Sequence, residues 1–291
     1  MKKIFGFVLL AAMMTTAVFA IPASEQAAID DLAAMIGRAP SYTTENDRIV
    51  TLNLYGKNIA SLPPSIVNLT ALRLIDLRSN NFTSVPEQLC EMTSLRELHL
   101  STNHLTDLPE SMGNLTGLEG LYIDYNRFSV LPSCVEKFKN LKRLDLSDNN
   151  LTSLPGWIGG LTEIVWLDLN SNNLASLPES MGNLTKTEWL WLYNNNLTFL
   201  PAGIGNMRKL ERLGLWSNKL TSLPSSIGSL TSLKYLWVMD NNLTSLPASI
   251  ADLKSNDWAV TPDFSRNRLP SPELRKILPA NEVEGQFGTQ H

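Results

Sequence analysis

The chain has few cysteines, few histidines and no excess of basic charge. Its 291 residues include two cysteines and three histidines, with 24 basic and 28 acidic side chains. A small fold stapled by disulfides is therefore excluded. His104 is expected at a turn and His291 ends the sequence, so no histidine cluster for a metal ion emerges. With 43% hydrophobic residues, the chain is expected to be held together by a sizeable core.

Long apolar runs are absent after residue 20. Before it, Lys2 and Lys3 precede an apolar run, and Val18-Phe19-Ala20 has the small-x-small pattern of a cleavage site. These features predict a secretory signal peptide over residues 1–20, with an uncleaved anchor as the alternative. No later segment is long and apolar enough to cross a bilayer. The product is expected in the periplasm, outside the cell or at its surface.

Basic charge becomes scarcer once the signal peptide is removed. Loss of Lys2 and Lys3 leaves 22 bases against 28 acids, a net charge of −6. This balance argues against nucleic acid and anionic membranes as partners.

What the chain does have is a repeat of 23 residues. The unit reads L-x-x-L-x-L-x-x-N-x-L-x-x-L-P-x-x-I-x-x-L-x-x. Three sets of residues keep this step: Leu98, Leu121, Leu144, Leu167, Leu190, Leu213, Leu236; Asn80, Asn103, Asn126, Asn149, Asn172, Asn195, Asn218, Asn241; and Pro63, Pro86, Pro109, Pro132, Pro155, Pro178, Pro201, Pro224, Pro247. The L-x-L segment predicts a short strand, and the buried Asn is suited to satisfy the backbone of the following turn. Leu-Pro predicts an extended return path, and stacked units supply the core.

Over residues 48–270 the unit resembles the leucine-rich repeat family, in the 23-residue Leu-Pro form of secreted bacterial and plant Ras-group-like members. The resemblance implies an α/β solenoid, a right-handed horseshoe. Short parallel strands would line its concave face, and irregular or 3-10 segments its convex face.

The two ends depart from the unit. Residues 21–47 are expected to form an N-terminal cap with an amphipathic helix over 24–37, begun by Ser24 and stopped by Gly37. Nine repeats are expected over 48–258, followed by a degenerate tenth repeat and a C-terminal cap over 259–279. Ser271 is expected to cap a closing helix, and residues 280–291 to form a flexible tail.

The residues that flank the inward leucines, such as Glu97, His99 and Ser101, are expected to form three columns along the concave face. Rungs are about 4.8 Å apart and columns roughly 6.6 Å apart. By the same spacing, Cys90 and Cys134 lie nearly two rungs apart, beyond the ~7 Å limit for a disulfide, so both thiols are predicted to be free.

Five of the seven tryptophans fall in these columns over four consecutive repeats. Such a patch exceeds the apolar area that monomers usually expose, and Trp and Tyr dominate binding hot spots. The alternative is that the rings merely pack on one another. The candidate ligand-binding residues are Trp166, Trp189, Trp191, Tyr193, Arg212, Gly214, Trp216, Tyr235, Trp237 and Met239, together with Asp145 and Asp168.

Gly214 lies between Trp191 and Trp237 in the middle column. The two indoles are then expected roughly 9–10 Å apart, leaving a slot for one flat group with Arg212 and Trp216 at its ends. The alternative is that the indoles lean over the glycine and fill the gap.

The N-terminal half of the face is acidic. Two arginines offset part of the negative charge of its carboxylates. These carboxylates are expected either to steer a basic region of a partner or only to keep the surface solvated. A calcium site on three of them lacks the regular oxygen spacing of a calcium loop. The carboxylates are Asp76, Glu97, Asp124, Asp145, Asp148 and Asp168.

Glu97, His99 and Ser101 have the residue types of a nucleophile, base and acid row. An open sheet offers them neither oxyanion donors nor an enclosed pocket. We therefore predict an exported binding protein, not an enzyme, without cofactor or metal. Its expected ligand is a protein on the concave face. The alternatives are a glycan held by the same aromatics, or inhibition of a secreted enzyme. A monomer is expected, with dimerisation through the aromatic patch left open.

Overall fold

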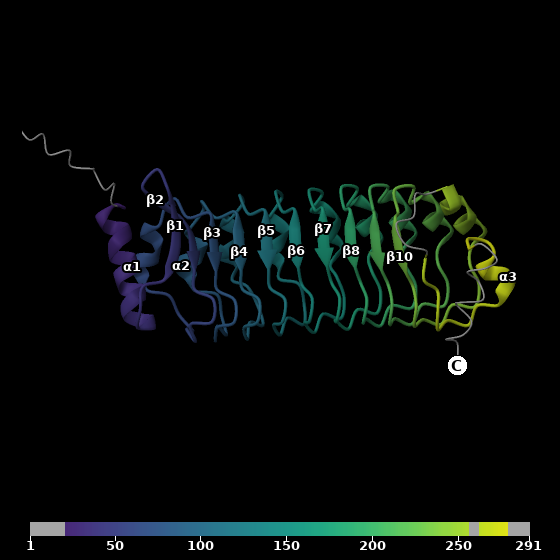
Figure 1. The fold of residues 1–291 in the computed structure, drawn as a ribbon, viewed down its shortest axis with the longest axis horizontal. Coiled ribbons are helices and arrows are strands. Elements are labelled where there is room, and N and C mark those ends of the chain that lie inside the picture. The colour runs from purple at the N-terminus through teal and green to yellow at the C-terminus, as the bar shows by residue number, and fades with distance from the viewer. Residues whose placement is uncertain (1–20, 256–261, 279–291) are drawn as a thin grey trace, which may run out of the picture.

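A computed structural model describes residues 21–255 and 262–278. Successive repeats stack along one axis, with helix α1 (Ala23–Ile36) at one end and the short helix α3 (Ser271–Leu274) at the other (Figure 1). The predicted signal peptide, Trp258 and the predicted tail lie outside the described residues.

One sheet of ten strands runs through the molecule in sequence order. Strand β1 (Ser41–Glu45) pairs antiparallel with β2 (Arg48–Asn53), and the strands from β2 onward are parallel. The later strands have three residues each: β3 (Leu74–Asp76), β4 (Glu97–His99), β5 (Gly120–Tyr122), β6 (Arg143–Asp145), β7 (Trp166–Asp168), β8 (Trp189–Trp191), β9 (Arg212–Gly214) and β10 (Tyr235–Trp237). Residues 23 apart are paired throughout, which confirms the predicted columns.

Short helices form the opposite side. They are η1 (Pro64–Asn68), α2 (Glu87–Cys90), η2 (Glu110–Asn114), η3 (Ser133–Lys137), η4 (Gly156–Gly160), η5 (Glu179–Asn183), η6 (Ala202–Asn206), η7 (Ser225–Ser229) and η8 (Ala248–Ser255). A proline in extended conformation precedes most of them, as at Pro132 with φ −60° and ψ 139°. The fold class expected from the repeat is therefore confirmed: an open solenoid with parallel strands on one face and 3-10 segments on the other.

The core fills the space between these two sides. The inward leucines of the strands are fully buried, and Phe82, Phe128, Phe138 and Phe264 are the largest side chains enclosed with them. Cys90 and Cys134 are buried free thiols, as predicted. A continuous row of this kind gives each repeat its hydrophobic contacts through its neighbours.

The N-terminal helix is joined to the first repeat by hydrogen bonds that the sequence did not predict. Helix α1 ends at Gly37, which has φ 76°, and its buried Glu25 accepts hydrogen bonds from Arg48 Nε (2.5 Å) and from Ile49 N (2.8 Å). The helix is thereby joined to β2 by a paired buried carboxylate. Strand β1 was not predicted, because its sequence carries no part of the repeat.

The start predicted at Ser24 is one residue late, and the cap predicted at Ser271 is wrong. Helix α1 begins at Ala23, and Pro22 at its N-cap makes no side-chain hydrogen bond. Pro270 takes the N-cap of α3, so that Ser271 is already its first helical residue. The carbonyl oxygens of the two prolines accept from the first helical amides, at 2.9 Å from Glu25 N to Pro22 and at 2.9 Å from Glu273 N to Pro270.

A ladder of buried asparagines connects each turn to the previous one. Asn149 is typical: its Nδ2 donates to the carbonyls of Ile123 (3.0 Å), Leu146 (3.2 Å) and Ser147 (3.1 Å). Its Oδ1 accepts from Phe128 N at 3.0 Å. The residue before each ladder asparagine has a positive φ, 50° at Asp148. The amide thus holds a strained turn and satisfies the backbone of two repeats at once.

We expect Asn149→Ala to destabilise the fold by about 3 kcal/mol, because it leaves four buried backbone partners unsatisfied. Urea unfolding followed by circular dichroism measures the loss. Asn150→Ala is the matched control, since that neighbouring side chain is exposed. Equal stability of the two variants would contradict the role given to the ladder.

Candidate functional site

The outward side chains of β2–β10 and of the residue two places after each strand form one surface, here called the strand face. In its C-terminal part the aromatic side chains are half-buried. They contact one another in two groups, and the larger group also includes an arginine.

Arg212 on β9 lies between two aromatic rings of the adjacent strands. Its Cζ is 4.3 Å from the ring centroid of Trp189 on β8 and 4.8 Å from that of Tyr235 on β10. The in-register pairing of these three residues places the guanidinium there. A cation between two π faces is attracted to both.

Four further rings pack beside this stack. Trp191 and Trp237 are stacked with centroids 5.5 Å apart, and Tyr193 and Trp216 with centroids 3.8 Å apart. Trp216 meets Trp191 edge-on at 6.1 Å, and Tyr235 stacks on Trp237 at 5.1 Å. We call these rings the aromatic cluster: Trp189, Trp191, Tyr193, Trp216, Tyr235 and Trp237.

The open slot predicted over Gly214 is absent. Gly214 is buried, and the indoles of Trp191 and Trp237 approach to stacking distance across it. A Cβ at this position would lie 2.6 Å from Trp191 Cε3 and 2.8 Å from Trp216 Cζ3. The glycine therefore provides space for the rings themselves, and the alternative weighed for this position is the correct one.

A shallow apolar hollow remains beside the stacked indoles. Trp191, Trp216, Trp237 and Met239 line it, with a volume of about 180 Å³. The hollow has room for a small apolar group such as one aliphatic or aromatic side chain. Gly214 itself lies beneath the rings. Unlike Trp191, Trp216 and Trp237, it makes room for the rings and does not line the hollow.

Trp166 belongs to the other aromatic group. Its ring lies 6.3 Å from that of Tyr122, which in turn lies 4.3 Å from the His99 ring. The predicted patch is therefore divided into two groups of rings, because the Trp166 ring contacts that of Tyr122 in the N-terminal half. The rings of the patch pack on one another, which is the alternative considered from the sequence.

Asp145 and Asp168 are neighbours on β6 and β7. Asp145 Oδ1 accepts from Ser147 N (3.0 Å) and Ser147 Oγ (2.7 Å). Asp168, 8% exposed, accepts from Asn170 N (3.0 Å) and Asn170 Nδ2 (2.6 Å). These bonds hold both carboxylates in fixed positions next to the aromatic cluster.

The crowding of these acids changes their protonation. Burial, together with the charges of Asp124 and Asp168, raises the pKa of Asp145 to about 7. Burial also raises the pKa of Asp168 to about 6, although the hydrogen bonds from Asn170 oppose the shift. Burial, together with the charges of Asp168 and Asp148, raises the pKa of Tyr193 to about 12. An incoming cation would relieve this repulsion.

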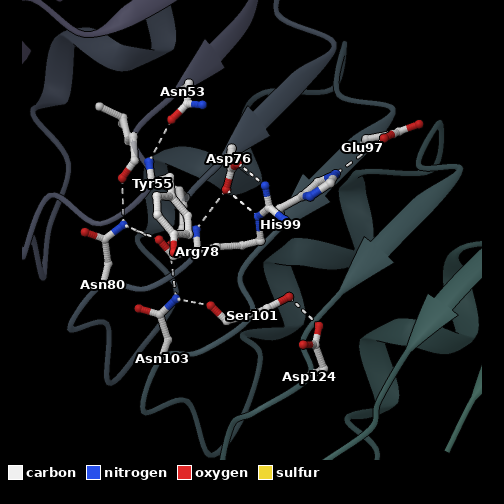
Figure 2. A network of polar contacts seen from close by, with 12 residues as sticks. Asn53, Tyr55, Asp76, Arg78, Asn80, Glu97, His99, Ser101, Asn103 and Asp124 are labelled. Atoms are coloured by element: carbon white, nitrogen blue, oxygen red, sulfur yellow. Dashed lines mark hydrogen bonds and ion pairs between the residues drawn. The ribbon is translucent and has the colours of Figure 1, made fainter.

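The N-terminal half of the face carries a polar network (Figure 2). Arg78 binds Asp76 through two nitrogens, at 2.9 and 2.6 Å. Burial alone would raise the pKa of Asp76, but the hydrogen bonds and charge of Arg78 outweigh it and lower that pKa.

Ser101 donates to Asp124, whereas His99 approaches Glu97 at 3.4 Å (Figure 2). The serine and the histidine therefore point to different partners, and the nucleophile–base pair considered from the sequence does not form. Within the described residues, no group of three or more His, Cys, Asp or Glu side chains is arranged to hold a metal ion.

Sequence reasoning missed a second hollow in this half. It measures about 410 Å³, and Tyr55, Tyr122, Tyr125, Asp124 and Asp145 are among its lining residues. Tyr125 is 57% exposed and follows the strand at a position of positive φ. The signal in the sequence was the outward position of Tyr55, after β2, and of Tyr122, on β5, followed by Tyr125 in the next turn.

Comparison with protein families gives two matches. A model described as leucine-rich repeat region matches residues 48–145 and 132–219, and a model of two leucine-rich repeats matches residues 208–255. Comparison with curated proteins finds no match. Of the helices within the described residues, none has the length and apolarity needed to cross a membrane.

Several solved structures are similar. A leucine-rich-repeat protein of Leptospira interrogans is 30% identical with a TM-score of 0.67, over 78% of this chain and 62% of its own. The ectodomain of the Arabidopsis thaliana receptor kinase GASSHO1/SCHENGEN3, solved with CASPARIAN STRIP INTEGRITY FACTOR 2, is 32% identical with a TM-score of 0.70, over 80% and 30%. The chain thus spans less than two thirds of the length of each. An internalin of Listeria monocytogenes shares the fold at 20% identity, with a TM-score of 0.56 over 86% and 84%.

We expect Asp145→Asn to stabilise the protein at pH 8 by on the order of 1–2 kcal/mol. The pKa of Asp145 is raised in the folded state from 3.8 to about 7. Its protonated form therefore favours folding at low pH, and this contribution is lost as the pH rises through 7. Urea unfolding at pH 5 and pH 8 should show the difference from wild type shrinking at pH 5. Asp47→Asn, on the exposed β1–β2 turn, is the control; a gain independent of pH would refute the assignment.

We expect Gly214→Ala to force the indoles of Trp191 and Trp216 apart, since its Cβ would overlap both rings. The near-ultraviolet circular dichroism of the stacked rings should change, with a loss of about 1–3 kcal/mol of stability. Gly156→Ala is the control because a Cβ there meets nothing within 4 Å. An unchanged spectrum would show that the space over Gly214 is open after all.

Proposed function

Because the chain belongs to the leucine-rich-repeat family, we propose that it is an exported, non-enzymatic binding protein that holds a protein partner on its strand face. The aromatic cluster, with Arg212, is the anchor. Asp145 and Asp168 form the adjoining electrostatic part of the same site. A role at the cell surface or in contact with host proteins follows from the proposed export.

The observation that carries the proposal is the hollow beside the stacked indoles. Trp191, Trp216, Trp237 and Met239 line about 180 Å³ of apolar space. Their rings are braced by one another, so an incoming side chain gains contact area without ordering the site first. Rigid aromatic pockets of this kind are where interfaces concentrate binding energy.

The similar structures support a polypeptide partner. The GASSHO1/SCHENGEN3 ectodomain was solved with CASPARIAN STRIP INTEGRITY FACTOR 2, and the plant peptide hormone receptor RGFR1 was solved with RGF2. Both are about 30% identical to this chain over more than three quarters of it. Their ligands are their own, but a solenoid with this repeat can present a binding face to a polypeptide.

The carboxylates define the second half of the proposed contact. Asp145 and Asp168 lie side by side, and burial makes their negative charge costly when no cation is near. A Lys or Arg of the partner placed over them would stabilise both ionised forms. The partner is therefore expected to bring a basic residue next to an apolar one.

A glycan is the second candidate, because sugar rings stack on exposed indoles as well. The half-buried faces of Trp191 and Trp237 favour it, whereas the adjoining acidic pair does not. Salt separates the two candidates: protein binding helped by Asp145 and Asp168 weakens with ionic strength, and stacking of a neutral sugar does not.

The experiment is a paired capture. The protein and its Trp191→Ala/Trp237→Ala variant are immobilised and exposed to a set of extracellular proteins and to a glycan panel. We expect a protein partner to be retained by wild type and lost by the variant, at least about tenfold in affinity. Retention should also fall as sodium chloride is raised.

Phe199→Ala is the control variant, because Phe199 is a large aromatic side chain that is 52% exposed and lies outside the cluster. Circular dichroism must show both variants folded. Equal capture by wild type and the double variant would overturn the proposed site, and capture of glycans alone would replace the protein partner with the second candidate.

A further inference from the structure

Arg212 differs from the other arginines of the strand face in its partners. Arg78 is paired with Asp76 at 2.6 Å, and Arg143 approaches Glu97 at 3.6 Å. Among the described residues, the Arg212 side chain has no hydrogen-bond or carboxylate partner, and its Nε is buried and unsatisfied. The nearby Glu211 is already paired with Lys234 at 3.0 Å.

Two aromatic rings flank this guanidinium. Its Cζ lies over the Trp189 ring at 4.3 Å from the centroid and over the Tyr235 ring at 4.8 Å. Hydrogen bonds from a guanidinium leave through its edge, in its own plane, and not through its faces. Nε is the buried nitrogen, whereas neither terminal amino nitrogen is among the buried, unsatisfied atoms of the described residues.

We propose that Arg212, clamped between Trp189 and Tyr235, is a binding site for a carboxylate, namely an Asp or Glu side chain of the protein partner. The inference rests on the proposed function and specifies the partner's chemistry. The planar fork of an arginine matches a carboxylate in a bidentate pair. Because the stack already holds the side chain, less rotamer entropy is lost on binding than for a free surface arginine.

The unpaired charge of Arg212 supports the same occupant. A charged side chain that is partly removed from water is stabilised by an opposite charge beside it. The aromatic rings compensate the charge in part but accept no N–H in the plane. A carboxylate at the terminal amino groups supplies the missing negative charge.

The position of Arg212 relative to the acidic pair constrains the partner further. Asp168 is on β7 and Arg212 is on β9, two rungs along the solenoid and one column across. Strand and residue spacings make this roughly 10–12 Å. An extended segment covers that distance in three to four residues. The partner is thus expected to carry an acidic residue over Arg212 and a basic residue three or four positions away.

The direct test uses small probes and the purified protein. The Nε–Hε resonance of Arg212, assigned from its absence in Arg212→Lys, is followed by nuclear magnetic resonance during addition of N-acetyl-glutamate methylamide. Concentrations up to about 0.1 M are needed, since one charge-assisted pair is worth only a few kcal/mol. N-acetyl-glutamine methylamide is the isosteric control, and sodium chloride keeps the ionic strength constant.

We expect a saturable shift of the Arg212 resonance with the glutamate compound and none with the glutamine compound. Equal shifts, or no shift with either, would overturn the carboxylate site. Binding of a uronate oligosaccharide without binding of the glutamate compound would overturn the protein partner and favour an acidic glycan.

The partner-level test compares variants in selection from a displayed peptide library. Wild type should enrich acidic residues three or four positions from a basic one, and Arg212→Lys should lose the acidic enrichment and bind the selected peptides about tenfold more weakly. Arg208→Lys, at an exposed position on the loop before β9, is the control. Equal binding by wild type and Arg212→Lys, with loss in Trp191→Ala/Trp237→Ala, would refute the carboxylate site and leave the proposed function standing.

Discussion

The amide of the buried asparagine is the interaction on which the rest of the structure depends. Each amide bonds the carbonyls of its own turn and of the previous one, as Asn149 does with Ser147 and Ile123. It thereby holds the residue before it, Asp148, at a positive φ and ends the strand after three residues. Because the same bonds recur every 23 residues, all strands end at one level and their registers agree.

That common register determines which side chains are neighbours on the strand face. Side chains 23 residues apart meet as neighbours, so Trp189, Arg212 and Tyr235 form one stack although each comes from a different repeat. Aromatic rings on a flat array of this kind pack on one another first. The rings leave a hollow beside Trp237 and, among the described residues, an Arg212 side chain whose Nε has no hydrogen-bond acceptor.

The strand face carries acidic and basic groups that lie apart along the solenoid. Asp145 and Asp168 repel each other, and burial disfavours their ionised forms. Among the described residues, the Arg212 side chain has no anionic partner. The separation of the two along the axis prevents them from neutralising each other, since the rungs hold them apart. A partner that carries both charges at the matching spacing would satisfy both groups, and this links the proposed function to the acidic residue inferred for the partner.

The sequence by itself determined the solenoid, the columns and the role of the asparagine. A strict period of 23 residues and a strand period of two place the backbone of each residue in the repeat. It also determined that Cys90 and Cys134 stay free. Only the tertiary structure decided where the side chains lean: the indoles closed over Gly214, Trp166 turned toward Tyr122, and Arg212 was clamped by two rings. Strand β1 and the buried Glu25 likewise lie outside the repeat. A period fixes backbone positions, whereas the direction of a side chain depends on the volume and charge of neighbours that no period specifies.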